Sequence, residues 1–120
     1  MRLSEIKKIL NAVAISKNAS DDANVNIMRA YCADLMSDVL AFSITNSLLI
    51  THLTNAQVIR TAEVADIKAI VFVEGKRPDV ETIAMADGKK IPLLVTGFST
   101  FDTCGRLYER GLRSQSDTGS

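Results

Sequence analysis

The sequence predicts a single α/β domain, a mostly parallel sheet with helices on its faces. Three short apolar runs predict strands, and each is followed by a segment with helical periodicity. The strands are expected at Ser47–Thr51, Ala69–Val73 and Pro92–Thr96. The helices are expected at Asn55–Asp66, Pro78–Asp87 and Thr100–Leu112. Short links and a spacing of about 22 residues between units are typical of parallel βαβ structure.

The first 24 residues predict a helix followed by an exposed turn. The helix is expected from Ser4, a candidate cap, to about Asn11. One buried stripe is expected along it, formed by Ile6, Ile9, Leu10 and Val13. The polar stretch Ser16–Asn24 predicts the turn.

A further strand and a short helix are expected before the first regular unit. Val25–Ala33 is apolar on both faces and predicts a covered strand, with Val25, Ile27 and Tyr31 on one face. Asp34 then predicts the cap of a helix over Leu35–Ala41. Its inward side chains are expected to be Leu35, Met36, Val39 and Leu40.

Capping signals agree with the helices of the second half. Thr54 and Gln57 have capping-box spacing, and Ser99 with Asp102 forms a looser box. Pro78 suits a first helical turn, and Gly88 suits a helix end. We therefore expect one domain over residues 1–112 and a polar, disordered tail over residues 113–120.

Composition excludes several classes of function. Lys+Arg and Asp+Glu both number 14, so the formal net charge is zero and no basic field favours nucleic acid or an anionic membrane. A balanced charge is compatible with self-association. Cys32 and Cys104 lie in no metal-binding or CxxC spacing, which favours two buried free thiols over a disulfide or metal pair.

The same features predict a cytoplasmic protein. Free thiols suit a reducing compartment. The first eight residues are too charged for the apolar region of a signal peptide, and the apolar runs are too short to span a membrane.

Candidate binding residues follow the predicted parallel strands. Ligands of open α/β sheets collect at the carboxyl ends of the strands, where helix N-termini can hold an anion. The segments there are Thr51–Asn55, Glu74–Pro78 and Thr96–Thr100. The candidate ligand-binding residues are Thr51, His52, Thr54, Asn55, Gly97, Ser99 and Thr100. The alternative is that Thr54 and Ser99 only cap helices.

Catalytic and metal chemistry have weaker support. His52 is the one histidine, and no motif pairs it with a nucleophile. Asp34 and Asp38 could bind Mg²⁺, but helix capping accounts for Asp34. Lys76 and Arg77 could attract phosphate, yet Gly75-Lys76-Arg77-Pro78 lacks the P-loop pattern and suits a solvated loop. We expect no catalytic residue, metal or cofactor.

Three stretches resemble the DRTGG domain family. The stretch Cys32–Leu40 resembles its Ser-Asp-Leu-Met-Ser-Asp-Val-Leu segment, and Leu49–Ala62 is similar to the segment that follows. Ile91–Phe101 resembles its closing Ile-Pro-Leu-Leu-x-Thr-Pro-x-Ser-Thr pattern, with Gly97 in place of proline. The string Asp-Arg-Thr-Gly-Gly that names the family is absent. The resemblance covers about residues 1–112.

This resemblance implies a three-layer α/β/α fold similar to the N-terminal domain of HPr kinase/phosphorylase. It also implies regulation and subunit contact rather than chemistry, because such domains accompany CBS domains in regulated pyrophosphatases. We therefore expect a non-catalytic homodimer that senses a nucleotide or other small anion. The alternative is an interaction module that docks a partner enzyme, such as a redox enzyme, a hydrogenase or a signalling kinase.

Overall fold

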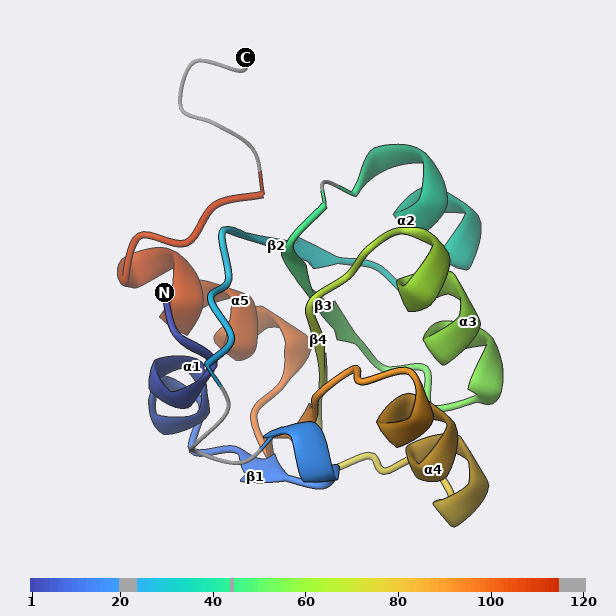
Figure 1. Cartoon of the computed structure of the whole chain (residues 1–120). Coiled ribbons are helices and arrows are strands. Elements are labelled where there is room, and N and C mark those ends of the chain that lie inside the picture. Colours follow the sequence, from blue (N-terminus) through green and yellow to red (C-terminus); the bar gives the residue numbers. More distant parts are fainter. Residues whose placement is uncertain (20–23, 44, 115–120) are drawn as a thin grey trace.

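The computed structural model describes residues 1–19, 24–43 and 45–114 and has the expected alternation of strands and helices (Figure 1). The helices are α1 (Leu3–Ile9), α2 (Met36–Phe42), α3 (Ala56–Val64), α4 (Val80–Gly88) and α5 (Thr100–Glu109), with a short 3₁₀ helix η1 (Lys17–Ala19). The strands are β1 (Val13–Ala14), β2 (Arg29–Cys32), β3 (Ser47–Thr51), β4 (Ala69–Phe72) and β5 (Leu93–Val95).

The strands form one mostly parallel sheet in the order β1-β5-β4-β3-β2. Strands β2 to β5 run parallel, with Tyr31 opposite Leu49 and Val71 opposite Leu94. Only β1 is antiparallel, and it pairs Val13 with Val95. Going along the chain from β2 to β5, each new strand lies next to the previous one in the same direction across the sheet. Because the connections between parallel strands share one handedness, α2, α3 and α4 all lie on one face.

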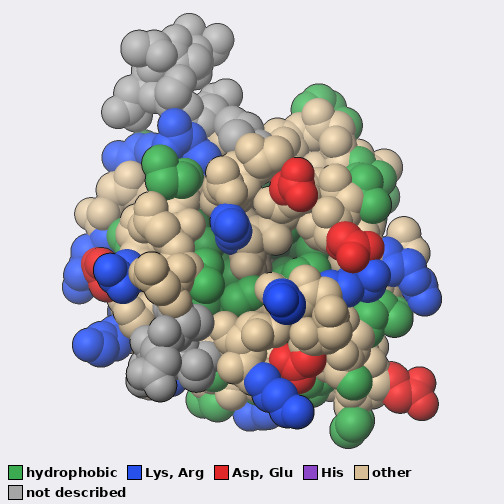
Figure 2. All heavy atoms as spheres, in the orientation of Figure 1, with side chains coloured by type: hydrophobic (Ala, Val, Ile, Leu, Met, Phe, Trp, Pro, Cys, Tyr) green, Lys and Arg blue, Asp and Glu red, His purple; other side chains and the backbone are tan. Residues whose placement is uncertain are grey.

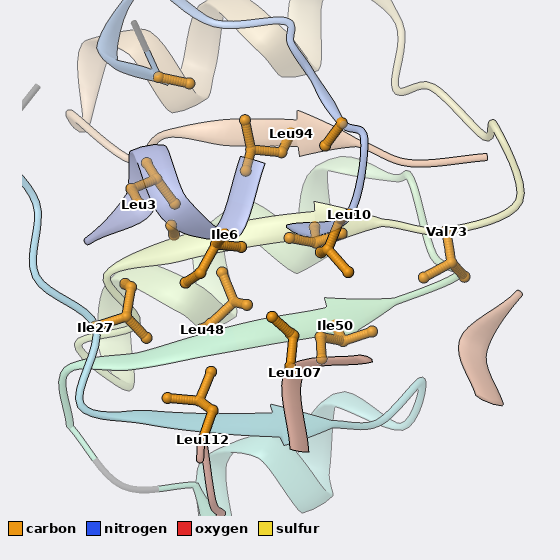
Figure 3. Packing of buried hydrophobic residues seen from close by; sticks show 14 residues of the cluster. Leu3, Ile6, Leu10, Ile27, Leu48, Ile50, Val73, Leu94, Leu107 and Leu112 are labelled. Carbon is orange, nitrogen blue, oxygen red and sulfur yellow. The ribbon is translucent and has the colours of Figure 1, made fainter. Parts of the chain in front are cut away.

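Helices cover both faces of the sheet, which confirms the three-layer α/β/α prediction. Figure 1 shows α2, α3 and α4 on one side of the strands and α1 and α5 on the other. Two buried clusters follow from this arrangement, the α1/α5 cluster and the α2–α4 cluster. In the α1/α5 cluster, Ile6, Leu10 and Leu107 pack over Leu48 and Ile50 of β3 (Figure 3).

The central strands are apolar because both of their faces are covered. Every residue of β3, β4 and β5 is buried. Leu48 and Ile50 belong to the α1/α5 cluster and Leu49 to the α2–α4 cluster, as the alternation of side chains along a strand requires. A fully buried leucine or isoleucine contributes about 1.5–3 kcal/mol, so these short strands supply a large share of the stabilisation that the core provides.

Four helices end in the same backbone motif. The residues Asn11, Asp66, Lys90 and Gly111 follow α1, α3, α4 and α5 with positive φ. The next residue then donates its N–H to the carbonyl five positions back, as Ile67 does to Ala62 and Ile91 to Ala86. This is the Schellman motif, and the donor residues Ala12, Ile67, Ile91 and Leu112 are all buried. The apolar residue after each helix thus fixes where the chain turns back to the sheet.

Several predicted caps are wrong. Ser4 lies inside α1, whose N-cap is Arg2, and Thr54 precedes the N-cap Asn55 of α3. Pro78 lies before α4 because Asp79 is the cap and accepts a hydrogen bond from the Thr82 N–H at 2.8 Å. Ser99 is a cap as predicted, and its Oγ accepts from the Asp102 N–H at 3.1 Å.

The N-terminal half departs furthest from prediction. Val13 belongs to β1 and is 52% exposed, not part of the buried stripe of α1. The expected strand over residues 25–33 is ordered as a strand only over Arg29–Cys32. Leu35 and Leu40 are exposed, because only the Met36 and Val39 side of α2 faces the sheet. The expected turn over residues 16–24 lies partly outside the described residues.

The cysteines are also less buried than predicted. Both are free thiols, but Cys32 is exposed and Cys104 is half-buried. The reason is that β2 is the last strand of the sheet and only partly covered.

Both edges of the sheet are short or covered. β1 contributes two residues at one edge. At the other edge, the N–H of Ala30 in β2 donates to the carbonyl of Arg113 at 3.0 Å, so the segment after α5 lies along this strand. Arg113 is the first residue of the predicted tail, and residues 115–120 lie outside the described part. None of the described helices has the length and apolar character that a membrane span requires.

Candidate functional site

Five polar side chains meet where the parallel strands end. We call Asp34, Thr51, His52, Glu74 and Thr100 the rim cluster. Asp34 lies two residues after β2, Thr51 ends β3, and His52 follows it. Glu74 lies two residues after β4, and Thr100 begins α5. The cluster thus joins the carboxyl ends of three neighbouring strands to the first residue of the helix that crosses the sheet.

His52 is the centre of the rim cluster. Its Nε2 contacts Oε1 of Glu74, and its Nδ1 lies 3.2 Å from Oγ1 of Thr100. Oδ2 of Asp34 is 3.7 Å from the same Nδ1. A neutral ring with its proton on Nε2 donates to Glu74 and accepts from the Thr100 hydroxyl, whereas a protonated ring donates at both nitrogens. The imidazole therefore has polar partners at both of its ring nitrogens.

Asp34 is held as a carboxylate by β3. Its Oδ1 accepts hydrogen bonds from the Thr51 hydroxyl at 2.9 Å and from the His52 N–H at 2.8 Å. Burial alone would raise the pKa of Asp34, but these bonds and the nearby imidazole outweigh it and lower the pKa below its ordinary value. The predicted capping role is wrong, because Leu35 is the N-cap of α2 and Asp34 turns toward β3.

Glu74 sits on an unusual turn. Glu74 and Gly75 both have positive φ, and the N–H of Lys76 donates to the carbonyl of Val73 at 3.1 Å, which is the geometry of a type I′ turn. The Glu74 N–H also donates to the Phe98 carbonyl at 2.9 Å. A left-handed conformation costs a residue other than glycine about 1–2 kcal/mol, and such residues cluster at functional sites.

The other candidate residues lie around the rim cluster rather than in it. Asn55 is the exposed N-cap of α3, and its side chain makes no cap hydrogen bond. Thr54 is half-buried just before it. Gly97 lies in the loop between β5 and α5, and nothing lies within 4 Å of where a Cβ would be. Ser99 is engaged in capping α5, so the capping alternative holds for Ser99 and not for Thr54.

Sequence reasoning missed two members of the rim cluster. The sequence predicts Asp34 as a helix cap, and it places Glu74 in the segment Glu74–Pro78 at the strand ends but not among the candidate binding residues. The available signal was positional, because Asp34 and Glu74 follow their strands as His52 follows β3, and parallel strands end at one edge. Among residues 1–19, 24–43 and 45–114, no group of three or more potential ligands has the arrangement of a metal site.

Two cavities lie at the opposite edge of the sheet. They have volumes of about 460 and 450 Å³ and share the residues Asn46, Lys68 and Lys90. Figure 2 views this edge, with lysine or arginine side chains around a hollow and no histidine visible. The sequence predicted no cavity here, because the lysines belong to the turns that precede β4 and β5 and carry no motif.

Comparison with known proteins identifies the family. The DRTGG domain model matches residues 5–109, so the chain belongs to the DRTGG domain family. This confirms the resemblance of the three sequence stretches. No curated protein matches the sequence.

A solved structure shares the fold. The chain superimposes with a TM-score of 0.73 and 18% identity on the CBS and DRTGG domains of the regulatory region of Clostridium perfringens pyrophosphatase, which was crystallised with its activator diadenosine tetraphosphate. The match covers 98% of this chain and 51% of that one, so this chain spans about half the length of its structural relative.

Proposed function

We propose that this chain is a non-catalytic regulatory domain that senses a nucleotide or other small anion at the rim cluster and acts as a homodimer. The observation that carries the proposal is the position of His52, which contacts groups from three separate segments. Membership of the DRTGG family supports a regulatory role. The pyrophosphatase regulatory region with its bound dinucleotide supports a nucleotide as the ligand class.

The charges of the rim cluster restrict how a nucleotide is oriented. Asp34 and Glu74 repel phosphate but accept hydrogen bonds from ribose hydroxyls or base amino groups. Phosphates are better placed against the N-terminus of α5, which begins at Thr100, and near the exposed Lys76 and Arg77. The sugar or base therefore faces the carboxylates, and the phosphates lie further out along the loops.

Ligand binding would be transmitted through α5. A ligand that takes the place of Thr100 as the partner of His52 breaks the link between β3 and the start of α5. Because α5 packs through Leu107 in the α1/α5 cluster and ends beside β2, its movement alters the face of the domain that carries α1 and α5. Ligand binding would thus change the conformation of the domain without a chemical reaction.

Isothermal titration calorimetry tests the proposal. The panel contains AMP, ADP, ATP, diadenosine tetraphosphate and inorganic phosphate, and each ligand is analysed afterwards to show that it is unchanged. We expect saturable binding of at least one nucleotide, weakened about tenfold, or ~1.4 kcal/mol, by His52→Gln or Thr100→Val. Sedimentation of the free and bound protein measures the homodimer.

The control variant is Lys90→Gln at the opposite edge of the sheet. It removes an exposed cation from both cavities and leaves the rim cluster intact. Equal affinity to the unmodified chain is expected. If Lys90→Gln abolishes binding and His52→Gln does not, the ligand site is at the edge of the sheet that carries the two cavities, and the proposal of a site at the rim cluster is wrong. If no ligand of the panel produces a heat change, the proposal of ligand sensing is refuted.

A second candidate function is docking of a partner enzyme. It is favoured by exposed aromatic residues on α5, where Phe101 is 84% and Tyr108 is 59% exposed, and on α2, where Phe42 is 67% exposed. Patches of this kind often mark protein contacts. Phe101→Ser together with Tyr108→Ser should abolish a complex recovered with the unmodified chain, and recovery of the same complex would exclude this surface.

A further inference from the structure

The two cysteines lie on the same side of the sheet, the side that α1 and α5 cover. Cys32 is the last residue of β2 and is exposed, and Cys104 lies in the middle of α5 and is half-buried. Ala30 of β2 packs against the α1/α5 cluster, and alternation places Cys32 on the same face of the strand. Cys104 packs against the same cluster, one turn before the buried Leu107.

Contacts on either side of Cys104 hold it in this position. Before it, the Thr100 hydroxyl contacts His52, directly after β3. After it, the Arg113 carbonyl accepts a hydrogen bond from Ala30 at 3.0 Å, in β2 itself. Between these points α5 runs past the carboxyl end of β2, on the side of the sheet where Cys32 lies.

The two thiols influence each other's ionisation, which distinguishes their roles. The interaction with Cys32 lowers the pKa of Cys104 to about 7, although burial acts in the opposite direction. The interaction with Cys104, together with burial, raises the pKa of Cys32. Near neutral pH the half-buried Cys104 therefore carries the thiolate, and the exposed Cys32 keeps its proton.

We propose that Cys32 and Cys104 form a reversible intramolecular disulfide by exchange with a low-molecular-weight disulfide such as oxidised glutathione. The Cys104 thiolate attacks one sulfur of the oxidant, forms a mixed disulfide and releases one glutathione thiolate. The Cys32 thiol then loses its proton and attacks the Cys104 sulfur, which releases the second glutathione. The protein pair loses two electrons and two protons, and the oxidant takes up both to become two thiols.

The crosslink would tie the end of the edge strand to the middle of α5. Asp34 lies two residues beyond Cys32, and Thr100 lies one helical turn before Cys104, so the bond would close beside the rim cluster. Oxidation would therefore limit movement of α5 relative to β2. This inference does not depend on nucleotide sensing, because the crosslink forms from residues outside the rim cluster.

The test is oxidation of the purified, reduced chain with oxidised glutathione near pH 7. We expect a monomer whose intact mass is lower by two hydrogens and a proteolytic peptide that joins Cys32 to Cys104. Its thermal unfolding midpoint should exceed that of the reduced chain, because the crosslink restricts the unfolded state. The rate should fall about tenfold for each pH unit well below the pKa of Cys104.

Two single variants separate this result from ordinary thiol oxidation. Cys32→Ser should stop at one glutathione adduct on Cys104, and Cys104→Ser should react more slowly. Circular dichroism establishes that both variants fold. Two glutathione adducts on the unmodified chain, or disulfides between chains, would overturn the proposal. Faster reaction of Cys104→Ser than of Cys32→Ser would overturn the assignment of the attacking thiol.

Discussion

The two edges of the sheet are built differently, although the same parallel strands begin at one edge and end at the other. At the carboxyl edge, the segments that follow β2, β3 and β4 direct polar side chains toward one another around His52. At the amino edge, the turns that precede β4 and β5 are fixed by backbone hydrogen bonds and by the buried residues Ile67 and Ile91. Contacts between polar side chains are therefore prominent at the carboxyl edge, and buried apolar residues after the helices are prominent at the amino edge.

This difference indicates how the fold separates stability from recognition. The amino edge uses left-handed residues and buried anchors, so its geometry depends on the core. The carboxyl edge uses partly exposed polar bonds, each of which contributes little net stability and can be exchanged for a ligand. Substitutions at the amino edge should therefore change stability most, and those at the rim cluster should change it least.

The largest effect is expected at Ile67. This residue is 5% exposed and anchors the end of α3 in the α2–α4 cluster. Ile67→Ala should lower the free energy of unfolding by about 3 kcal/mol, because a buried cavity replaces the side chain. Urea denaturation measures the change. Val64→Ala, at a 73% exposed position at the end of α3, should stay within about 0.5 kcal/mol, and similar losses for both would refute the anchoring role.

An intermediate effect of opposite sign is expected at Lys90. Its φ is 60°, and lysine has no side chain suited to the left-handed conformation. Lys90→Gly should raise the free energy of unfolding by about 1 kcal/mol. Lys68→Gly is the matched control, because Lys68 lines the same two cavities without positive φ, and it should lose about 0.5–1 kcal/mol. Destabilisation by Lys90→Gly would mean that its side chain has a structural role.

The smallest effect is expected at Asp34, and it should depend on pH. The folded-state pKa of Asp34 lies below the ordinary value, so its stabilisation is fully present above about pH 4 and is lost as the pH falls through the folded pKa. Asp34→Asn should cost less than about 1 kcal/mol at neutral pH, because the side chain is 55% exposed and screened. Chemical denaturation at neutral pH and near pH 3 measures the difference, which should shrink in acid. A constant difference would show that ionisation of Asp34 does not matter.

The central fold could be predicted because its signals are local. Ser47–Thr51 has the predicted bounds, and β4 and β5 lie within theirs, since strands covered on both faces must be continuously apolar. β1 could not be predicted in the same way. Two residues carry no periodicity, and β1 exists because Val13 and Ala14 pair with β5, some 80 positions later.

The location of the candidate site could be predicted from the sequence, but the full set of residues that form it could not. Strand order brought Thr51, His52 and Thr100 to one edge, as expected for a parallel sheet. The role of Asp34 depends on the register of β2 against β3, which places it near Thr51 and His52. The role of Glu74 depends on a turn that holds a residue other than glycine at positive φ. Neither register nor such a turn can be derived from composition or spacing.

The covered edge of β2 has a consequence for assembly. Within the described part of the chain, Arg113 occupies a backbone partner position on β2, and β1 offers only two residues at the far side. Joining the sheets of two copies through β2 would therefore displace the segment after α5 from Ala30, and β1 is too short to offer more than a small ladder. A dimer of this domain should instead associate through helix surfaces, which leaves the hydrogen-bond ladder of each sheet intact.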